Sequence, residues 1–204
     1  NFANYCGTKY CVGVVNGLDA LIIILRSYKE LGVFEDEDEV IVPANTYITT
    51  IMAILECNLK PVFVEPLIET FNIDPESVRK NISPYTKAIM AVDIFGHSCD
   101  IDSLMEIAEE FNLKIIGDTA QAPGTFNKNR VTGSIAHVGG YSLNRHKHIQ
   151  TGEGGICVTN DKQISENLQL IRNHAEAVVG DKGHSDLTNM VGYNFRMGEI
   201  EAAI

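Results

Sequence analysis

The segment "KAIMAVDIFGHSCDIDSLMEIAEEFNLKIIGD" (residues 87–118) decides the fold class. Two short apolar runs, 87–93 and 113–118, enclose a stretch with apolar residues at helical spacing, 101–111. A strand, a helix and a second strand of these lengths are typical of a βαβ unit, in which both strands run parallel in one sheet. The segment therefore predicts an α/β protein.

The same alternation continues in both directions from this segment. We expect further strands at 10–15, 39–43, 60–65, 138–142 and 154–159, and further helices at 18–31, 47–57, 75–81 and 162–174. Strands that are apolar almost throughout indicate a sheet covered on both faces. Because the sequence has no repeat or linker, it predicts one domain with three layers, α/β/α, and a mostly parallel central sheet.

The composition excludes several classes of protein. The 204 residues are 45% hydrophobic, enough for one sizeable core, and the net charge of −11 argues against a nucleic-acid partner. No apolar run approaches the roughly 18 residues of a membrane span. The five cysteines form no CxxC pair, which is typical of reduced thiols in a cytoplasmic protein. Because the chain lacks an initiator Met and stops within an apparent helix, we expect a domain of a longer protein.

Polar residues follow several of the predicted strands, where ligands bind in parallel sheets. They are Asn16-Gly17, Asn45-Thr46-Tyr47, Asp93, Asp118 and the run 142–147. Gly17 allows a tight turn into a helix whose free N–H groups can bind an anion, although an ordinary turn with Asp19 in the first helical turn explains it equally. Asp118 could pair with a protonated pyridine nitrogen or simply cap the next turn.

The segment "SLNRHKHIQTGEGG" (142–155) gathers cations in an otherwise acidic chain. A metal site is poorly supported, because His146 and His148 have only Glu153 nearby as a further ligand. A solvated basic loop would not need three glycines, which indicate close backbone approach. Neighbouring cations and partial burial favour a neutral, nucleophilic lysine amine, so we favour imine chemistry at Lys147. If the segment is extended, both histidines should point away from the lysine.

Six ordered motifs give the chain a resemblance to the DegT/DnrJ/StrS family of sugar aminotransferases. They are "YCGTKYCVGVVNGLDAL" (5–21), "VIVPANTYITTIMAI" (40–54), "PVFVEP" (61–66), "IIGDTAQAPG" (115–124), "YSLNRHKHIQTGEGGICVTND" (141–161) and "GYNFRMGEIEAAI" (192–204). The family resemblance covers essentially the whole chain. It implies a fold-type I pyridoxal-phosphate enzyme, of which residues 1–204 are the cofactor-binding large domain without the N-terminal helix and the small C-terminal domain.

The resemblance also implies roles for individual residues. Lys147 forms the internal aldimine with pyridoxal 5'-phosphate and shuttles a proton, and Asp118 pairs with the pyridinium nitrogen. At the cofactor phosphate the resemblance places Ser142 and the backbone of Gly17 and Leu18. It places Tyr47 on the ring and Gln121 at the ring hydroxyl. In a homodimer, Asn194, or Arg196 in its place, reaches the phosphate of the neighbouring subunit. No metal is implied.

The expected activity is amino transfer from L-glutamate to a nucleotide-linked 3- or 4-keto-6-deoxysugar, as in lipopolysaccharide or related amino-sugar biosynthesis. This chain departs from many relatives at Leu143, Asn144 and Arg145, just before the lysine. A dehydratase branch of the family has histidine at the lysine position, so Lys147 favours transamination. Two alternatives remain: a nucleotide-sugar dehydratase, and a non-catalytic regulatory module, which would not form the aldimine. We expect a cytoplasmic enzyme with no membrane partner.

Overall fold

A seven-stranded sheet forms the centre of the molecule, in the order β1-β9-β8-β5-β4-β2-β3. Its strands are Tyr10–Val14 (β1), Glu39–Pro43 (β2), Lys60–Val64 (β3), Thr86–Val92 (β4), Lys114–Asp118 (β5), Val138–Ser142 (β8) and Gly155–Thr159 (β9). The strand β9 runs antiparallel to β1 and β8, whereas β3, β2, β4, β5 and β8 pair in parallel. The computed structural model describes residues 1–176 and 190–204.

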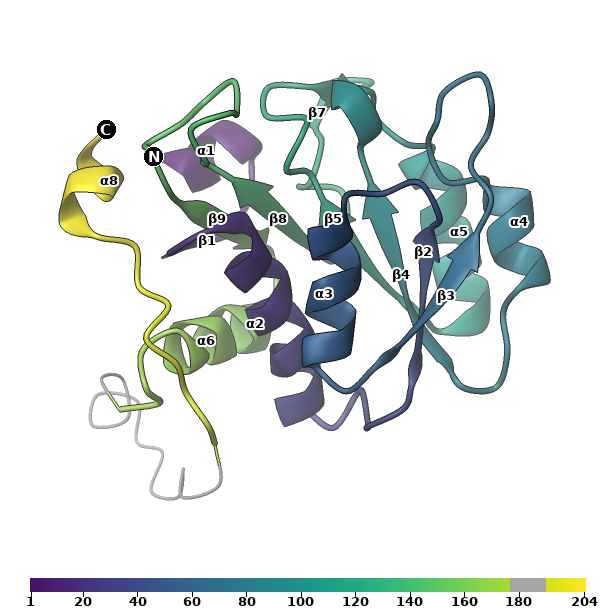
Figure 1. Cartoon of the computed structure of the whole chain (residues 1–204), viewed down its shortest axis with the longest axis horizontal. Coiled ribbons are helices and arrows are strands. Elements are labelled where there is room, and N and C mark those ends of the chain that lie inside the picture. The colour runs from purple at the N-terminus through teal and green to yellow at the C-terminus, as the bar shows by residue number, and fades with distance from the viewer. Residues whose placement is uncertain (177–189) are drawn as a thin grey trace.

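Helices cover both faces of this sheet (Figure 1). They are Phe2–Cys6 (α1), Gly17–Glu30 (α2), Ile48–Glu56 (α3), Pro75–Lys80 (α4), Ile101–Phe111 (α5), Lys162–Ile171 (α6) and Glu199–Ala203 (α8). One apolar core joins α2, α3 and α6 to one face, and a second joins α4 and α5 to the other. The predicted three-layer fold with a mostly parallel sheet is therefore confirmed.

The central helix α2 shows why the sequence folds in this way. Its run Ala20–Leu25 is buried on all sides, between the sheet, α3 and α6. Each fully buried Ile or Leu side chain contributes about 1.5–3 kcal/mol relative to exposure. The helix begins after Asn16, whose side-chain oxygen accepts a hydrogen bond from Asp19 N at 2.9 Å. This cap satisfies one of the free donors of the first turn and fixes where the helix starts.

The boundaries of several elements differ slightly from those predicted. The first strand ends at Val14 and not Val15, α6 ends at Ile171 and not residue 174, and Asp93 lies just beyond β4. A larger difference concerns the segment after Ser142, where Lys147 N donates to Asn144 O at 2.8 Å in a turn. The segment is therefore not extended, so the condition under which His146 and His148 were expected to point away from Lys147 is not met.

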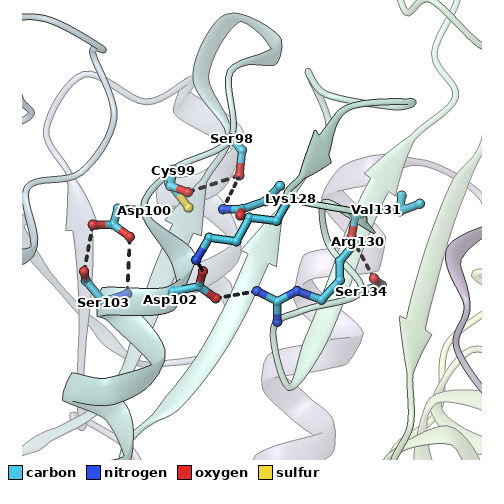
Figure 2. Close-up of polar contacts among 10 residues, drawn as sticks. Ser98, Cys99, Asp100, Asp102, Ser103, Lys128, Arg130, Val131 and Ser134 are labelled. Atoms are coloured by element: carbon cyan, nitrogen blue, oxygen red, sulfur yellow. Dashed lines mark hydrogen bonds and ion pairs between the residues drawn. The ribbon is translucent and has the colours of Figure 1, made fainter.

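A small hairpin that the sequence analysis did not predict joins the layer on the α5 side. Its strands are Phe126–Asn127 (β6) and Arg130–Val131 (β7). Asp102 of α5 accepts hydrogen bonds from Lys128, at 2.7 Å, and from Arg130 (Figure 2). The two cations lower the pKa of the Asp102 carboxyl. Because these ion pairs are largely exposed, they position the hairpin more than they stabilise the fold.

The longest of the described helices, α2, has 14 residues. Within residues 1–176 and 190–204, none is both long enough and apolar enough to cross a bilayer.

Candidate active site

A cavity of about 650 Å³ opens at the carboxyl ends of β1, β5 and β8. The residues around it come from the turn before α2, the start of α3, the segment after β5 and the turn after β8. They are Asn16, Gly17, Leu18, Leu21, Thr46, Tyr47, Thr49, Asp118, Ala120, Gln121, Ser142, Asn144, His146, Lys147 and Glu153. Seven of the eight cofactor-binding residues predicted from the sequence thus surround one space, at the edge of the sheet where ligands bind in α/β proteins.

One wall of the cavity is the N-terminal end of α2. A Cβ atom added at Gly17 would lie 2.7 Å from Ser142 Cβ, so only glycine lets α2 approach β8 this closely. The close approach brings the Ser142 hydroxyl beside the first N–H groups of the helix, which have no helical partner. Free N–H donors, a hydroxyl and the helix dipole together make an anion-binding corner.

The floor of the cavity holds the carboxylate of Asp118, the last residue of β5. Asp118 Oδ2 accepts a hydrogen bond from Thr50 Oγ1 at 2.7 Å, and Oδ1 accepts one from Ala120 N at 3.2 Å. Thr46 Oγ1 lies 2.8 Å from Thr50 Oγ1 and donates to it, because the Thr50 proton is already directed at Asp118. Burial raises the pKa of Asp118, and the Thr50 hydroxyl, the Ala120 amide and the Lys147 charge partly oppose that rise.

The turn after β8 brings Lys147 to the wall of the cavity. Lys147 is half-buried, whereas His146 and His148 are exposed. The turn is fixed by two backbone hydrogen bonds, from Lys147 N to Asn144 O and from Arg145 N to Gly152 O, each 2.8 Å long. Asn144 Nδ2 also donates to Glu153 Oε1 at 2.6 Å, which joins the turn to its glycine-rich exit. The lysine amine is thus presented by a braced segment.

Two further predicted residues lie over the same space. Tyr47 precedes the first residue of α3 and is 65% exposed, so its ring is free to pack against a planar ligand. Gln121 also lines the cavity, and its Oε1 accepts a hydrogen bond from Phe95 N at 2.8 Å. Since the oxygen is occupied, the amide presents its NH₂ group as a donor.

Asn194 and Arg196 belong to a segment that bridges to Val14, the last residue of β1. Asn194 is exposed and bridges to Asn173, and Arg196 Nη1 donates to Asn173 Oδ1 at 2.7 Å. Neither residue lines the cavity of its own chain. Their role at the phosphate of a second subunit stays a prediction.

Three residues that support the site were not among the predicted cofactor-binding residues. Thr50 supports Asp118 from within α3, and Asn144 and Glu153 brace the lysine turn. Thr50 carries no local sequence signal, because it meets Asp118 only in the folded chain. Asp93, which lies just after β4, accepts hydrogen bonds from Cys99 N and Thr119 Oγ1 and does not line the cavity. In the part of the chain that the structure describes, no three His, Cys, Asp or Glu side chains are grouped to hold a metal ion.

Comparison with known proteins relates this geometry to a family. The model of the DegT/DnrJ/EryC1/StrS aminotransferase family matches residues 1–204. The dTDP-3-amino-3,6-dideoxy-alpha-D-galactopyranose transaminase of Aneurinibacillus thermoaerophilus is 44% identical over 205 residues, which are 100% of this chain and 53% of that protein. The chain therefore spans about half the length of this curated relative.

Solved structures show the same similarity. An aminotransferase from Psychrobacter cryohalolentis superposes with a TM-score of 0.91 at 33% identity, over 99% of this chain and 52% of the other. The E. coli GDP-4-keto-6-deoxy-D-mannose-3-dehydratase with bound hydrated PLP superposes with a TM-score of 0.88 at 29% identity, over 99% and 56%. With its whole length matched by the family model, the chain belongs to the DegT/DnrJ/EryC1/StrS aminotransferase family.

Proposed function

We propose that the chain is the cofactor-binding domain of a pyridoxal-phosphate-dependent aminotransferase. In this proposal it moves an amino group from L-glutamate to a nucleotide-linked 3- or 4-keto-6-deoxysugar. The observation that carries the proposal is the arrangement of three groups around one cavity: an anion-binding helix end at Gly17, a buried carboxylate at Asp118 and a lysine amine at Lys147. Each group matches one part of the cofactor.

The residues present fit pyridoxal phosphate. Its phosphate suits the corner formed by Ser142 and the start of α2, where Gly17 has no Cβ to separate helix and strand. Asp118 is buried, and among the described residues no cation forms a salt bridge with it. A protonated ring nitrogen would supply the missing partner for this carboxylate.

When bound, the cofactor supplies a conjugated ring that stabilises negative charge at the reacting carbon of the substrate. Lys147 Nζ would have two tasks: it would hold the cofactor covalently and, once released from it, carry the proton between the substrate carbon and the cofactor carbon C4′. Asp118 keeps the ring nitrogen protonated, and Thr50 and Ala120 N fix the position of its oxygens. Tyr47 packs on the ring, and Gln121 donates to the oxygen on the ring.

The lysine favours amino transfer over dehydration. The solved dehydratase shares the fold, so the fold alone does not separate the two activities. The family resemblance places a histidine at this position in the dehydratase branch, whereas this chain has Lys147 between two histidines. Only a primary amine can form a covalent imine with the cofactor aldehyde.

We propose further that the active unit is a two-fold symmetric homodimer. The exposed positions of Asn194 and Arg196, outside their own cavity, suit residues that complete the phosphate site of a second subunit. In a two-fold interface each subunit would supply the same residue to its partner.

Borohydride reduction of the protein purified with pyridoxal phosphate, followed by peptide mapping, tests the cofactor assignment. The pyridoxyl label should lie on Lys147, and Lys147→Ala should abolish it. A label on another lysine would overturn the assignment. Incubation with L-glutamate and a panel of nucleotide-linked keto-deoxysugars, followed by mass spectrometry, tests the reaction. An aminated sugar is expected, and a product that has lost water without gaining nitrogen would instead establish dehydration.

A further inference from the structure

Two exposed aromatic residues face one another near the mouth of the site. The rings of Phe71 and Phe95 pack edge to face, with centroids 6.0 Å apart and planes at 74°. Phe71 is 45% exposed and Phe95 is 79% exposed. Both have a left-handed backbone, with φ of 60° and 54°. An exposed aromatic side chain in this conformation does not help the fold, because glycine or asparagine adopts it more readily. Such strain is typical of functional sites.

The turn that carries Phe95 is held in place by buried and polar side chains. Asn72 is only 2% exposed; its Oδ1 accepts a hydrogen bond from Ile94 N, and its Nδ2 donates to His97 O, each at 2.9 Å. Phe95 N donates to Gln121 Oε1 at 2.8 Å. These three contacts fix the backbone on both sides of Phe95. The ring is therefore presented to solvent by a rigid turn.

Phe95 also forms a wall of a second cavity, of about 280 Å³. This cavity continues from the first, because both are lined by Gln121, His146 and Lys147. The walls that belong only to the second cavity are Phe95, Pro123 and His148. It thus combines flat apolar surfaces with two imidazoles, beside the amine that the proposed reaction uses.

We propose that this second cavity is the subsite for the sugar ring of the amino acceptor, with Phe95 as the surface on which that ring packs. The assignment rests on the proposed function. Cavities that enclose drug-sized ligands are about 300–1,000 Å³, so a space of about 280 Å³ suits one pyranose ring and not a whole nucleotide-sugar. The C–H groups of a deoxysugar can lie against an aromatic ring, and imidazoles can donate to its hydroxyls.

The position of Lys147 decides which part of the acceptor lies here. The keto carbon that receives nitrogen belongs to the sugar, so the sugar must be the part nearest to this amine. The nucleotide base is separated from the keto carbon by the diphosphate, so it lies farther from Lys147. Because Phe95 and Lys147 line the same cavity, Phe95 should contact the sugar and not the base.

Direct binding to the full-length protein tests this assignment without catalysis. The probes are dTDP- and GDP-linked 6-deoxyhexoses, which lack the keto group, and dTDP and GDP alone. Isothermal titration compares the unmodified protein with Phe95→Gly, which removes the ring and relieves the backbone, and with Phe95→Asn as a second variant. Tyr85→Ala is the matched control, because Tyr85 is 67% exposed and precedes β4, whereas Phe95 follows it.

The comparison uses whichever nucleotide-sugar the unmodified protein binds more tightly. Both Phe95 variants should bind it about tenfold more weakly than the unmodified protein does. Their binding of the free nucleotide should stay unchanged. Tyr85→Ala should bind both probes normally. If all the proteins bind the nucleotide-sugar equally well, the role of Phe95 is overturned, but the proposed acceptor class is not. An equal loss for the free nucleotide would place the base on Phe95 and also overturn that role. If the unmodified protein binds neither nucleotide-sugar, the proposed acceptor class fails, and this subsite fails with it.

Discussion

Thr50 Oγ1 donates a hydrogen bond to Asp118 Oδ2 across 2.7 Å inside the protein core, although 68 residues separate the two in the chain. The bond favours the ionised carboxylate, which burial disfavours. Thr46 completes the chain of hydroxyls by donating to Thr50. The proposed mechanism needs an ionised Asp118 beside the protonated ring nitrogen. Thr50, a residue of α3, therefore helps to keep that carboxylate ionised.

Thr50→Val should raise the pKa of Asp118 further, because the nearly isosteric side chain removes the donor and leaves the carboxylate buried. Loss of a hydrogen bond to a charged group costs about 1.5–3 kcal/mol, so we expect kcat/KM to fall by about tenfold or more. The acidic limb of the pH profile should move to higher pH. Thr50→Ser keeps the hydroxyl and is the control, which should resemble the unmodified protein. Identical pH profiles for the Val variant and the unmodified protein would contradict this role.

Asp118→Asn should retain the cofactor but slow amino transfer, because an amide cannot balance the charge of the protonated ring nitrogen. Removing one preorganised electrostatic group from an active site lowers kcat on the order of a hundredfold. Cofactor content is measured from visible absorbance, and turnover from the aminated sugar formed. Near-normal turnover with full cofactor content would show that the carboxylate has no such function.

Asp93 allows a prediction about stability and pH. Burial raises its pKa to about 6, although Cys99 N and Thr119 Oγ1 stabilise the ionised form. A carboxyl with a raised pKa holds its proton more tightly in the folded state. Its contribution to stability is therefore complete below about pH 4 and is lost as the pH rises to about 6. Asp93→Asn should remove this loss, since an amide can still accept from Cys99 N.

Urea unfolding at pH 4 and pH 8 measures this effect. The free energy of unfolding of the Asn variant, relative to that of the unmodified protein, should be about 3 kcal/mol higher at pH 8 than at pH 4. Asp102→Asn is the control of opposite sign, because Lys128 and Arg130 lower the pKa of Asp102. That variant should lose a little stability at pH 8, by a small amount because the ion pairs are exposed. A pH-independent difference for Asp93→Asn would show that Asp93 is ionised throughout this range.

Asn194→Ala and Arg196→Ala should weaken cofactor retention while leaving the protomer folded. Both residues are exposed, and the hydrogen bond from Arg196 to Asn173 is exposed as well, so little stability is at risk. A sharper test uses whichever of these two substitutions weakens cofactor retention. Subunits that carry it are mixed with Lys147→Ala subunits. If each site draws on two subunits, a random mixture regains about a quarter of the intact sites. A mixture without regained activity, or a fully active monomer in sedimentation, would contradict the shared site.

Most of the architecture could be predicted from local patterns, because strands and helices of this size have distinct apolar periods. The positions of Asp118 and Ser142 at strand ends followed from the same patterns. The hairpin of β6 and β7 could not be predicted, since its strands have two residues each and depend on Asp102 of α5. The role of Thr50 was missed because it arises from a contact between distant segments.

At Gly17 the fold and the site depend on the same feature, the absence of a Cβ atom. Its predicted anion-binding role needs α2 to lie against β8, and a Cβ at this position would meet Ser142 Cβ at 2.7 Å and Cα at 3.3 Å. Because the second of these is backbone, the helix or the strand must move. Gly17→Ala should therefore destabilise the protein by about 1–3 kcal/mol, despite the better helix propensity of alanine.

The same displacement should move the N–H groups of α2 away from Ser142 and weaken cofactor binding. Gly13→Ala is the matched control, since its Cβ would meet mainly the side chain of Met197, with Sδ at 3.2 Å, which can turn away. Urea unfolding and titration with pyridoxal phosphate are compared for both variants. The control should retain most of its stability and affinity, whereas Gly17→Ala should lose both. If Gly17→Ala bound the cofactor as tightly as the control, close packing of α2 on β8 would not be what forms the anion site.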